Sequence, residues 1–564
     1  MTLIFPMDLE KTTDNWVDLT FLGGLGEIGL NLMTVETAEH LVVVDAGLMF
    51  PEDHMFGIDI VIPDFSYLRE RQDKLAGLVL THGHEDHIGA VPFLLKEMPL
   101  PVYGTPLTLA LLREKLREHG LLNDADLREI QPREPLVLGP FEFEFIPVPH
   151  SILDGVGFAL RTPQGVIIHS GDFKVDQTPV VGSGMDLNRF AHYGEQGVLA
   201  LLSDSTNAER PGYTLSEREI GATLEEFIRE APGRVIIAVF ASHIPRIVQI
   251  VRLAAKHGRK ILFNGKSMLT NTRIAKELGY LEIPPGLEIN VGELNQLPSQ
   301  ETIIVTTGSQ GEPLSALARI ALESHKHIQI QKGDLVILSS KFIPGNERAI
   351  STVINNLYRL GAEVVYEEVA EIHVSGHAYQ EELKLLLNLT RPRYFIPIHG
   401  EMRHLIKHTH LARAVGIPEE RLLLAKDGEQ VRFENGNATI SGGIEVGRVF
   451  VDGKGVGDVS RMVLRDRRHL AGDGLVIALV AVDPVAAQIV SEPDLITRGF
   501  TLEEEQAPLL EQARKIFLEI VERSLTEPNQ DWLEIQTQAS KALRKLFFKA
   551  LERRPMILPL ILTL

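Results

Sequence analysis

The side chains with the clearest chemistry lie in one short loop. His82, His84, Asp86 and His87 fall within six residues, directly after the apolar run LAGLVL at 75–80. In an extended segment, side chains two residues apart point the same way, and the following turn can present the other two beside them. Imidazole nitrogens and carboxylate oxygens are common metal ligands, and the chain contains no cysteine that could supply a thiolate. The loop therefore predicts a divalent metal site.

Three further candidate ligands follow β-rich runs elsewhere in the chain. They are His150 in FIPVPHS, Asp172 in IIHSGDF and His399 in FIPIHGE. We expect them to gather with the histidine loop. Two divalent ions about 3.5–4 Å apart can activate a water molecule and neutralise charge on a phosphoryl transition state. The set therefore fits phosphodiester hydrolysis.

The order of these motifs resembles the metallo-β-lactamase superfamily, in which Asp45 would supply the first motif. The long stretch between Asp172 and His399 leaves room for the inserted β-CASP domain of the branch that processes nucleic acids. The stretches GGLGEIGLN at 23–31, DAGLMFPED at 45–53 and RVFVDGKGVGDV at 448–459 further resemble one bacterial ribonuclease family of this branch. The resemblance runs through almost the whole chain.

The resemblance implies a ligand set for two ions, either zinc or manganese. It assigns His82, His84 and His150 to one ion, and Asp86, His87 and His399 to the other, with Asp172 as the bridge. Asp45 would orient the histidine loop without binding metal. Asp86 and Asp172 thus belong to the catalytic set as well as to the metal set.

The same resemblance implies an acid for the leaving group. His377 in EIHVSGHA would donate the proton, and Asp204 in LLSDSTNAERPG would orient or charge it. Taken without the family, Asp204 is also a plausible cap of a turn in DSTN. A further structural cation would bind Asp452, together with backbone groups near 47–50.

The RNA is expected to be held near its 5′ end by two segments. The first, with small residues that can cradle a phosphate, comprises His373, Val374, Ser375, Gly376, His377 and Ala378. The second is FASHIPR at 240–246, with Ser242 and His243. It resembles the family's FASNIHR loop, but His243 and Pro245 replace its Asn and His, which bears on the preference for a 5′-monophosphate.

The fold class that follows is α/β. We expect a metallo-β-lactamase αββα sandwich with an inserted β-CASP α/β domain and a small C-terminal α/β domain. The sandwich would occupy 1–209 and 371–425, the insertion 210–370, a linker with completing strands 426–465, and the C-terminal domain 466–564. Helices are expected over 107–120, 215–233 (with a capping box of Ser216 and Glu219), 502–525 and 530–552. The apolar tail at 555–564 reads as a buried last strand.

Composition is that of an ordinary folded protein, with a formal net charge of −20 over 564 residues. This charge argues against a polyanionic partner unless positive charge is local. We expect such a groove from residues interleaved with the motifs: Lys174, Arg210, Arg246, Lys341, Arg348, Arg393 and Arg403. The acidic run LEEEQAP at 502–508 would lie far from it.

The chain is expected to be cytoplasmic, because MTLIFPMDLEKTTDN lacks the features of a secretion signal, and no membrane span is expected. RNA is the expected partner. The resemblance also implies a homodimer or homotetramer and partners in an RNA-decay complex.

The leading hypothesis is a metal-dependent ribonuclease with 5′-to-3′ exonuclease and endonuclease activity in RNA maturation and decay, leaving 5′-phosphates. A small-molecule hydrolase of the same superfamily, acting on a thioester or lactone, would not need the insertion at 210–370. A non-catalytic RNA-binding scaffold would not need a filled ligand set. The sequence contains neither a G-x-S-x-G elbow nor a Walker A loop.

Overall fold

The computed structural model describes residues 16–52, 54–312, 314–342, 346–453, 455–500, 507–526 and 531–564. The chain divides into two compact units, one comprising 1–49 and 62–448, the other 50–61 and 449–564. The N-terminal segment 1–15 and most of the acidic run at 502–508 lie outside the described residues. The domain boundaries expected from the sequence stay a prediction.

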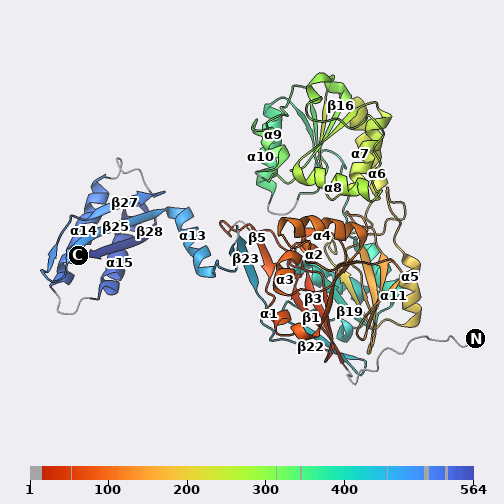
Figure 1. Ribbon diagram of the computed structural model, residues 1–564, viewed down its shortest axis with the longest axis horizontal. Coiled ribbons are helices and arrows are strands. Elements are labelled where there is room, and N and C mark those ends of the chain that lie inside the picture. Colours follow the sequence, from red (N-terminus) through yellow and green to blue (C-terminus); the bar gives the residue numbers. More distant parts are fainter. Residues whose placement is uncertain are drawn as a thin grey trace, which may run out of the picture. The chain divides into compact units, whose positions relative to one another are not determined.

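The first unit begins with an eight-stranded sheet that draws on both ends of the unit. Its order is β22-β21-β1-β3-β4-β6-β7-β8. Figure 1 labels β1, β3 and β22 of this sheet. The strands are β1 (Trp16–Gly23), β3 (Leu32–Glu36), β4 (Leu41–Val44), β6 (Leu75–Val79), β7 (Val102–Gly104), β8 (Leu127–Glu129), β21 (Gln430–Glu434) and β22 (Asn437–Ser441). β4 and β6 run parallel, so both end at the same edge.

A six-stranded sheet faces the first, with the order β19-β13-β12-β11-β10-β9. The strands are β9 (Pro135–Leu138), β10 (Phe141–Pro147), β11 (Val156–Thr162), β12 (Gly165–His169), β13 (Ala200–Asp204) and β19 (Tyr394–Ile398). Phe143, Phe145 and Phe158 pack from this sheet against Leu19 and Val44 of the other. This apolar layer holds the two sheets of the sandwich together.

Helices cover the outer faces of the sandwich. α5 (Leu187–Gln196), α11 (Gln380–Thr390) and α12 (Met402–Ala414) pack on the six-stranded sheet. Beside the other sheet lie α1 (Ser66–Arg69), α2 (Glu85–Ile88), α3 (Val91–Glu97) and α4 (Pro106–Glu118), with a 3-10 turn at Gln72–Lys74. A short bridge pairs β2 (Leu25–Gly26) with β20 (Gly400–Glu401). The structure thus has the expected αββα layers.

Between β13 and β19 the chain forms a five-stranded parallel sheet of its own, in the order β15-β16-β14-β17-β18. The strands are β14 (Val235–Ala238), β15 (Lys260–Asn264), β16 (Thr302–Thr306), β17 (Leu335–Leu338) and β18 (Glu363–Val365). Their apolar runs are continuous because helices cover both faces. α6 (Glu217–Glu230), α7 (Ile244–Lys256) and α8 (Lys266–Glu277) lie on one face, and α9 (Ala316–Ala321) and α10 (Glu347–Arg359) on the other. Short 3-10 turns occur at Leu294–Gln296, Ser299–Glu301 and Glu419–Arg421.

The helix expected over 215–233 forms as α6, and its capping box of Ser216 and Glu219 is present. Its last residue is Glu230, shortly before Gly233.

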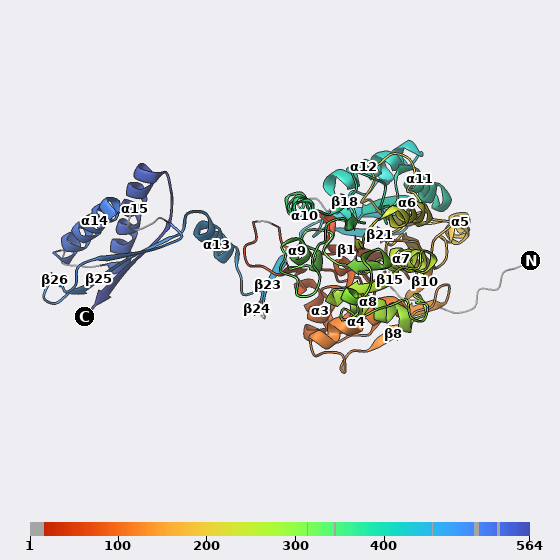
Figure 2. The same cartoon turned by 90° about the horizontal axis from the view of Figure 1, so that it is seen from above.

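The second unit contains β5 (Ile60–Pro63, shared with the first unit at its end), β23 (Arg448–Asp452), β24 (Gly455–Val456) and α13 (Arg461–Asp473). It ends with β25 (Leu475–Asp483), β26 (Gln488–Ile489), β27 (Asp494–Arg498), α14 (Ala507–Leu525), α15 (Trp532–Leu551) and β28 (Met556–Thr563). β25, β26, β27 and β28 form one sheet, and α14 and α15 lie on one side of it (Figure 2).

The apolar tail forms a strand, as expected, but the prediction that it is buried is wrong. β28 pairs in parallel with β25, and Ile557 faces the helices. Leu558, Leu560 and Leu562 are 43–50% exposed, because the two helices cover only one face of the sheet.

The structural cation at Asp452, with backbone groups near 47–50, stays a prediction. The Oδ2 atom of Asp452 lies 2.6 Å from the Arg467 guanidinium, so a cationic side chain already neutralises this carboxylate. Among the described residues, no group of three candidate metal ligands includes Asp452.

No helix of the described chain combines the length and the apolarity that crossing a bilayer requires.

A half-buried pair of carboxyl groups, Asp427 and Glu27, lies beside the β2 bridge. The Asp427 Oδ1 atom accepts a hydrogen bond of 3.0 Å from the Leu25 amide, and Glu27 pairs with Arg448 at 2.5 Å. Burial and the neighbouring Glu27 carboxylate raise the pKa of Asp427 to about 8. The folded chain therefore holds a proton here that the unfolded chain, with an aspartate pKa of about 3.9, releases.

Asp427→Asn tests this proton. Because the folded pKa lies above the unfolded one, the free energy of unfolding decreases as pH rises from about 4 to about 8, so the folded state becomes less stable. The uncharged amide has no such loss and keeps an acceptor for Leu25. We expect the variant to melt about 1–3 °C above the wild type at pH 9 and close to it at pH 5, measured by calorimetry. The exposed change Asp124→Asn is the control, and a difference that does not grow with pH would contradict the assignment.

Candidate metal centre and proton donor

The candidate ligands follow the ends of strands that meet at one edge of the sandwich. The loop with His82 follows β6, His150 follows β10 and Asp172 follows β12. Asp204 is the last residue of β13, and His399 follows β19. In the six-stranded sheet β12, β13 and β19 are parallel neighbours, so Asp172, Asp204 and His399 come from adjacent strand ends.

The first predicted trio is assembled. His84 Nδ1 lies 3.1 Å from His82 Nε2 and 3.2 Å from His150 Nε2. These three nitrogens form one of the candidate metal groups of the described residues.

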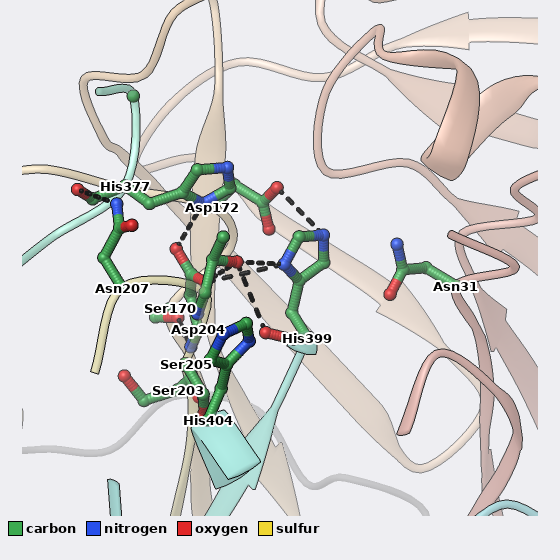
Figure 3. Close-up of polar contacts among 12 residues, drawn as sticks. Asn31, Ser170, Asp172, Ser203, Asp204, Ser205, Asn207, His377, His399 and His404 are labelled. Carbon is green, nitrogen blue, oxygen red and sulfur yellow. Dashed lines mark hydrogen bonds and ion pairs between the residues drawn. The ribbon is translucent and has the colours of Figure 1, made fainter. Parts of the chain in front are cut away.

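The second trio and the predicted bridge lie beside it. Asp86, His87 and His399 form another such group, with 3.4 Å between Asp86 Oδ2 and His399 Nε2. Asp172 Oδ2 is 3.3 Å from the Nε2 atoms of both His87 and His399, and 3.8 Å from His82 Nε2. This single oxygen therefore faces both trios (Figure 3 draws its contact with His399).

Contacts behind the rings fix which nitrogen points inward. His87 Nδ1 lies 2.8 Å from Asp45 Oδ2, and the other Asp45 oxygen accepts from the Thr81 amide at 2.8 Å. His150 Nδ1 contacts the Gly376 carbonyl at 2.8 Å, and His399 Nδ1 contacts the Thr206 hydroxyl at 2.7 Å. Each contact leaves Nε2 for the centre. Asp45 therefore lies where the sequence placed it, behind the histidine loop.

The electrostatics of the two trios differ. Burial lowers the pKa of His82 and His150 well below the usual value and that of His84 to about 4, so these rings are neutral. Burial also disfavours charged His87, but the carboxylates of Asp172, Asp86 and Asp45 outweigh it and raise its pKa to about 10. The carboxylates thus favour positive charge at this place.

The donor set fits divalent ions. Nitrogens that each lie about 2.0–2.1 Å from a tetrahedral ion are about 3.3 Å apart. In the first trio, His84 Nδ1 is 3.1 Å from the His82 nitrogen and 3.2 Å from the His150 nitrogen. The second trio supplies a carboxylate that neutralises part of a dication's charge. Nitrogen and oxygen donors without sulfur suit zinc or manganese.

The predicted proton donor adjoins the centre. His377 Nδ1 lies 2.7 Å from Asp204 Oδ2, and the His377 ring stacks on His399 with centroids 5.4 Å apart (Figure 3). Burial lowers the pKa of His377, but the Asp204 carboxylate outweighs it and raises the pKa above the usual value. Asp204 also accepts from the Thr206 amide at 2.9 Å, so it caps this turn while it holds His377.

The segment 373–378 lies beside His377, but its members differ in what they can offer. Ser375 Oγ accepts from Asn207 at 2.7 Å and from the His377 amide at 3.1 Å, which leaves its own hydroxyl hydrogen to donate. Gly376 packs so closely that a Cβ would lie 2.7 Å from the His150 ring. Val374 and Ala378 are buried, and the Ala378 amide already donates to Phe173.

The loop of Ser242 and His243 only partly meets its prediction. Ser242 lies half-buried in the turn before α7. The His243 side chain is 1% exposed and contacts Glu217 at 3.2 Å, so its position does not support direct contact with RNA. His373 is half-buried, and its ring is 6.4 Å from that of His243.

The expected positive groove needs correction at two of its seven residues. Arg246 is fully buried, with hydrogen bonds to Glu217 and to the Ile372 carbonyl. Lys174 is 1% exposed and lies 3.7 Å from Glu217 and Asp176. These charges neutralise buried carboxylates and are unavailable to a phosphate.

Sequence reasoning missed several polar residues at the site. Thr81 and Thr206 orient ligands, and Asn207 donates to Ser375 and to the His377 carbonyl. Asn31 lies 3.3 Å from His87 Nε2. Thr206 and Asn207 follow Asp204 within the same DSTN turn, and that proximity was the available signal.

The fold and the paired ligand clusters define a metallohydrolase of the metallo-β-lactamase class with an inserted domain. Four family models match the chain: "Beta-lactamase superfamily domain" at 30–186, "Ribonuclease J, beta-CASP domain" at 232–357, "Zn-dependent metallo-hydrolase RNA specificity domain" at 361–420, and "Ribonuclease J C-terminal domain" at 462–564. A solved structure from Enterococcus faecalis V583, a protein of unknown function, is 16% identical with a TM-score of 0.52, and covers 74% of this chain and 100% of that chain. That likeness shows the fold alone.

The chain belongs to the ribonuclease J family. It is 43% identical to Ribonuclease J2 of Bacillus subtilis over 553 residues, which are 98% of this chain and 99% of the relative. It is 45% identical to Ribonuclease J of Thermus thermophilus over 555 residues, which are 97% and 95% of the two chains. The resemblance seen in the motifs is thereby confirmed.

Asp45→Asn tests the orientation of the histidine loop. Asp45 has φ of 58°, a conformation that asparagine also tolerates, so the change acts on the hydrogen bonds. An amide at this place can no longer accept from both Thr81 and His87. We expect about 10–100-fold weaker metal binding, measured by chelator competition and elemental analysis. The exposed change Asp73→Asn is the control, and unchanged metal affinity in Asp45→Asn would refute the role of Asp45.

Proposed function

We propose that this metal-dependent ribonuclease removes nucleotides in the 5′-to-3′ direction, also cuts internally, and leaves 5′-phosphates. The observation that carries the proposal is the His377–Asp204 pair, 2.7 Å apart, beside the two ligand trios. Cleavage between phosphorus and the 3′-oxygen produces an alkoxide that needs a proton, and this pair would supply an acid for it.

His377 is suited to give that proton. Its Nδ1 faces Asp204, and candidate ligand atoms of His377, His150 and Asp172 lie within 4.8 Å of one another. The raised pKa of His377 keeps the ring protonated closer to neutrality than a free histidine. Asp204, which is 1% exposed, fixes the ring and stabilises its charge.

The two trios and Asp172 would hold two divalent ions, zinc or manganese. Such ions, when bound, supply Lewis acidity and the activation of water that phosphodiester hydrolysis requires. The side chains His82, His84 and His150 would bind one ion, and Asp86, His87 and His399 the other. The match of residues 361–420 to a zinc-dependent metallo-hydrolase model favours zinc.

The segment 373–378 would bind phosphate near the 5′ end of the RNA. Ser375, whose oxygen accepts from Asn207 and from the His377 amide, directs its hydrogen to the ligand. Ser242 would contribute from the turn before α7. A role of the chain in RNA maturation and decay, in the cytoplasm and as a homodimer or homotetramer with decay-complex partners, extends this proposal.

The test is digestion of 5′-labelled RNA that carries either a monophosphate or a triphosphate. We expect release of mononucleotides with 5′-phosphates from the monophosphorylated RNA, loss of activity with a chelator, and a loss of at least about 1,000-fold in Asp172→Ala. Elemental analysis should find less metal in the variant. Products with 3′-phosphates, or full activity of Asp172→Ala, would refute the proposal.

His377→Ala tests the proton donor separately. Because His377 is outside both trios, we expect the metal content to be unchanged while kcat falls about 100–10,000-fold. The exposed change His192→Ala is the control. A variant that keeps wild-type kcat would remove His377 from the reaction.

A further inference from the structure

A buried carboxylate outside the metal centre has an unusual set of partners. Glu382 lies in the first turn of α11 and is fully buried. Its Oε1 accepts from the Val175 amide at 2.8 Å. Its Oε2 accepts from the amides of Tyr379 and Thr214, both at 2.8 Å, and contacts the Thr214 hydroxyl at 2.7 Å.

These partners come from three separate segments that lead to the site. Val175 is three residues after Asp172, and Tyr379 is two residues after His377. The Thr214 hydroxyl also lies 3.1 Å from the His377 carbonyl oxygen. The segment of Val175 and the segment of Tyr379 meet again where the Ala378 amide donates to the Phe173 carbonyl at 2.7 Å. Glu382 therefore joins the chain after Asp172 to the chain around His377, beside the backbone hydrogen bond between Ala378 and Phe173.

The charge of Glu382 is balanced only by dipoles. Among the described residues, no lysine, arginine or histidine nitrogen forms an ion pair with this carboxylate, in contrast to the buried Glu217 nearby. A buried carboxylate is costly unless hydrogen-bond donors surround it. Capping α11 requires only the Tyr379 amide. The donors from Val175 and Thr214 contribute nothing to the cap, so they point to a second purpose.

We propose that Glu382 is a positioning residue that holds the His377 segment against the strand end carrying Asp172, so that the His377 proton reaches the leaving 3′-oxygen. The inference rests on the proposed function. In the step concerned, the bond between phosphorus and the 3′-oxygen breaks and the proton of His377 goes to that oxygen. Glu382 touches neither group and acts through the backbone of residues 377–379 and through Thr214.

The experiment is Glu382→Gln, which keeps the shape but turns one acceptor into a donor facing an amide. We expect kcat on RNA to fall about 10–100-fold, with KM changed less than about threefold and metal content unchanged. A second substrate carries a sulfur in place of the bridging 3′-oxygen at the scissile linkage. A thiolate leaves without a proton, so on this substrate the variant should come within about threefold of the wild type.

Glu381→Gln is the matched control, because this neighbouring side chain is 40% exposed and pairs with Lys384. Thr214→Val, which removes the hydroxyl between Glu382 and the His377 carbonyl, should show the same pattern with a smaller loss of about 2–10-fold, and it decides the matter if Glu382→Gln does not fold. Equal losses on both substrates, or no loss with an active wild type, would overturn the inference. A wild type inert toward both substrates would instead refute the proposed function.

Discussion

The centre depends on one oxygen atom. Asp172 Oδ2 lies 3.3 Å from nitrogens of His87 and His399 and 3.8 Å from one of His82, and these residues come from the ends of three different strands. So many ligand atoms can meet around one carboxylate only if β6, β12 and β19 end at the same edge. The apolar layer between the two sheets, which includes Phe143, Phe145 and Phe158, fixes that edge. The positions of the candidate metal ligands therefore depend on the packing of the core between the two sheets.

The polar groups behind the ligands solve a second problem. A buried imidazole has two nitrogens, and only one can face a metal ion. Asp45, the Gly376 carbonyl and Thr206 each take the outer nitrogen of one ring. Glu382 lies farther from the centre and accepts hydrogen bonds from backbone amides, so it holds backbone segments in place, whereas the other groups hold imidazole rings. The site is therefore built in layers, and each layer restricts the freedom of the one inside it.

The sequence predicted the fold class through its resemblance to a known superfamily, and it singled out all seven candidate ligands because histidine and aspartate after apolar runs form a rare pattern. It did not reveal Thr206, Asn207 or Glu382, since these residue types are common in turns and first helical turns, and only the folded chain shows that their partners lie more than 160 residues away. His243 was misjudged for a similar reason: a histidine in a loop carries no sign that Glu217 will enclose it. The exposed face of β28 was missed because an apolar strand reads the same whether one or both faces are covered.

The strand order has a consequence for biosynthesis. β1, the first strand of the described residues, pairs on one side with β3 and on the other with β21, whose residues are translated some four hundred positions later. β13 likewise pairs with β19, which is made much later, and His399 follows β19. A nascent chain on the ribosome therefore has neither a finished sheet nor a full ligand set until the intervening parallel sheet has been completed. By the proposed function, the metal centre can therefore assemble only after nearly the whole first unit has been made.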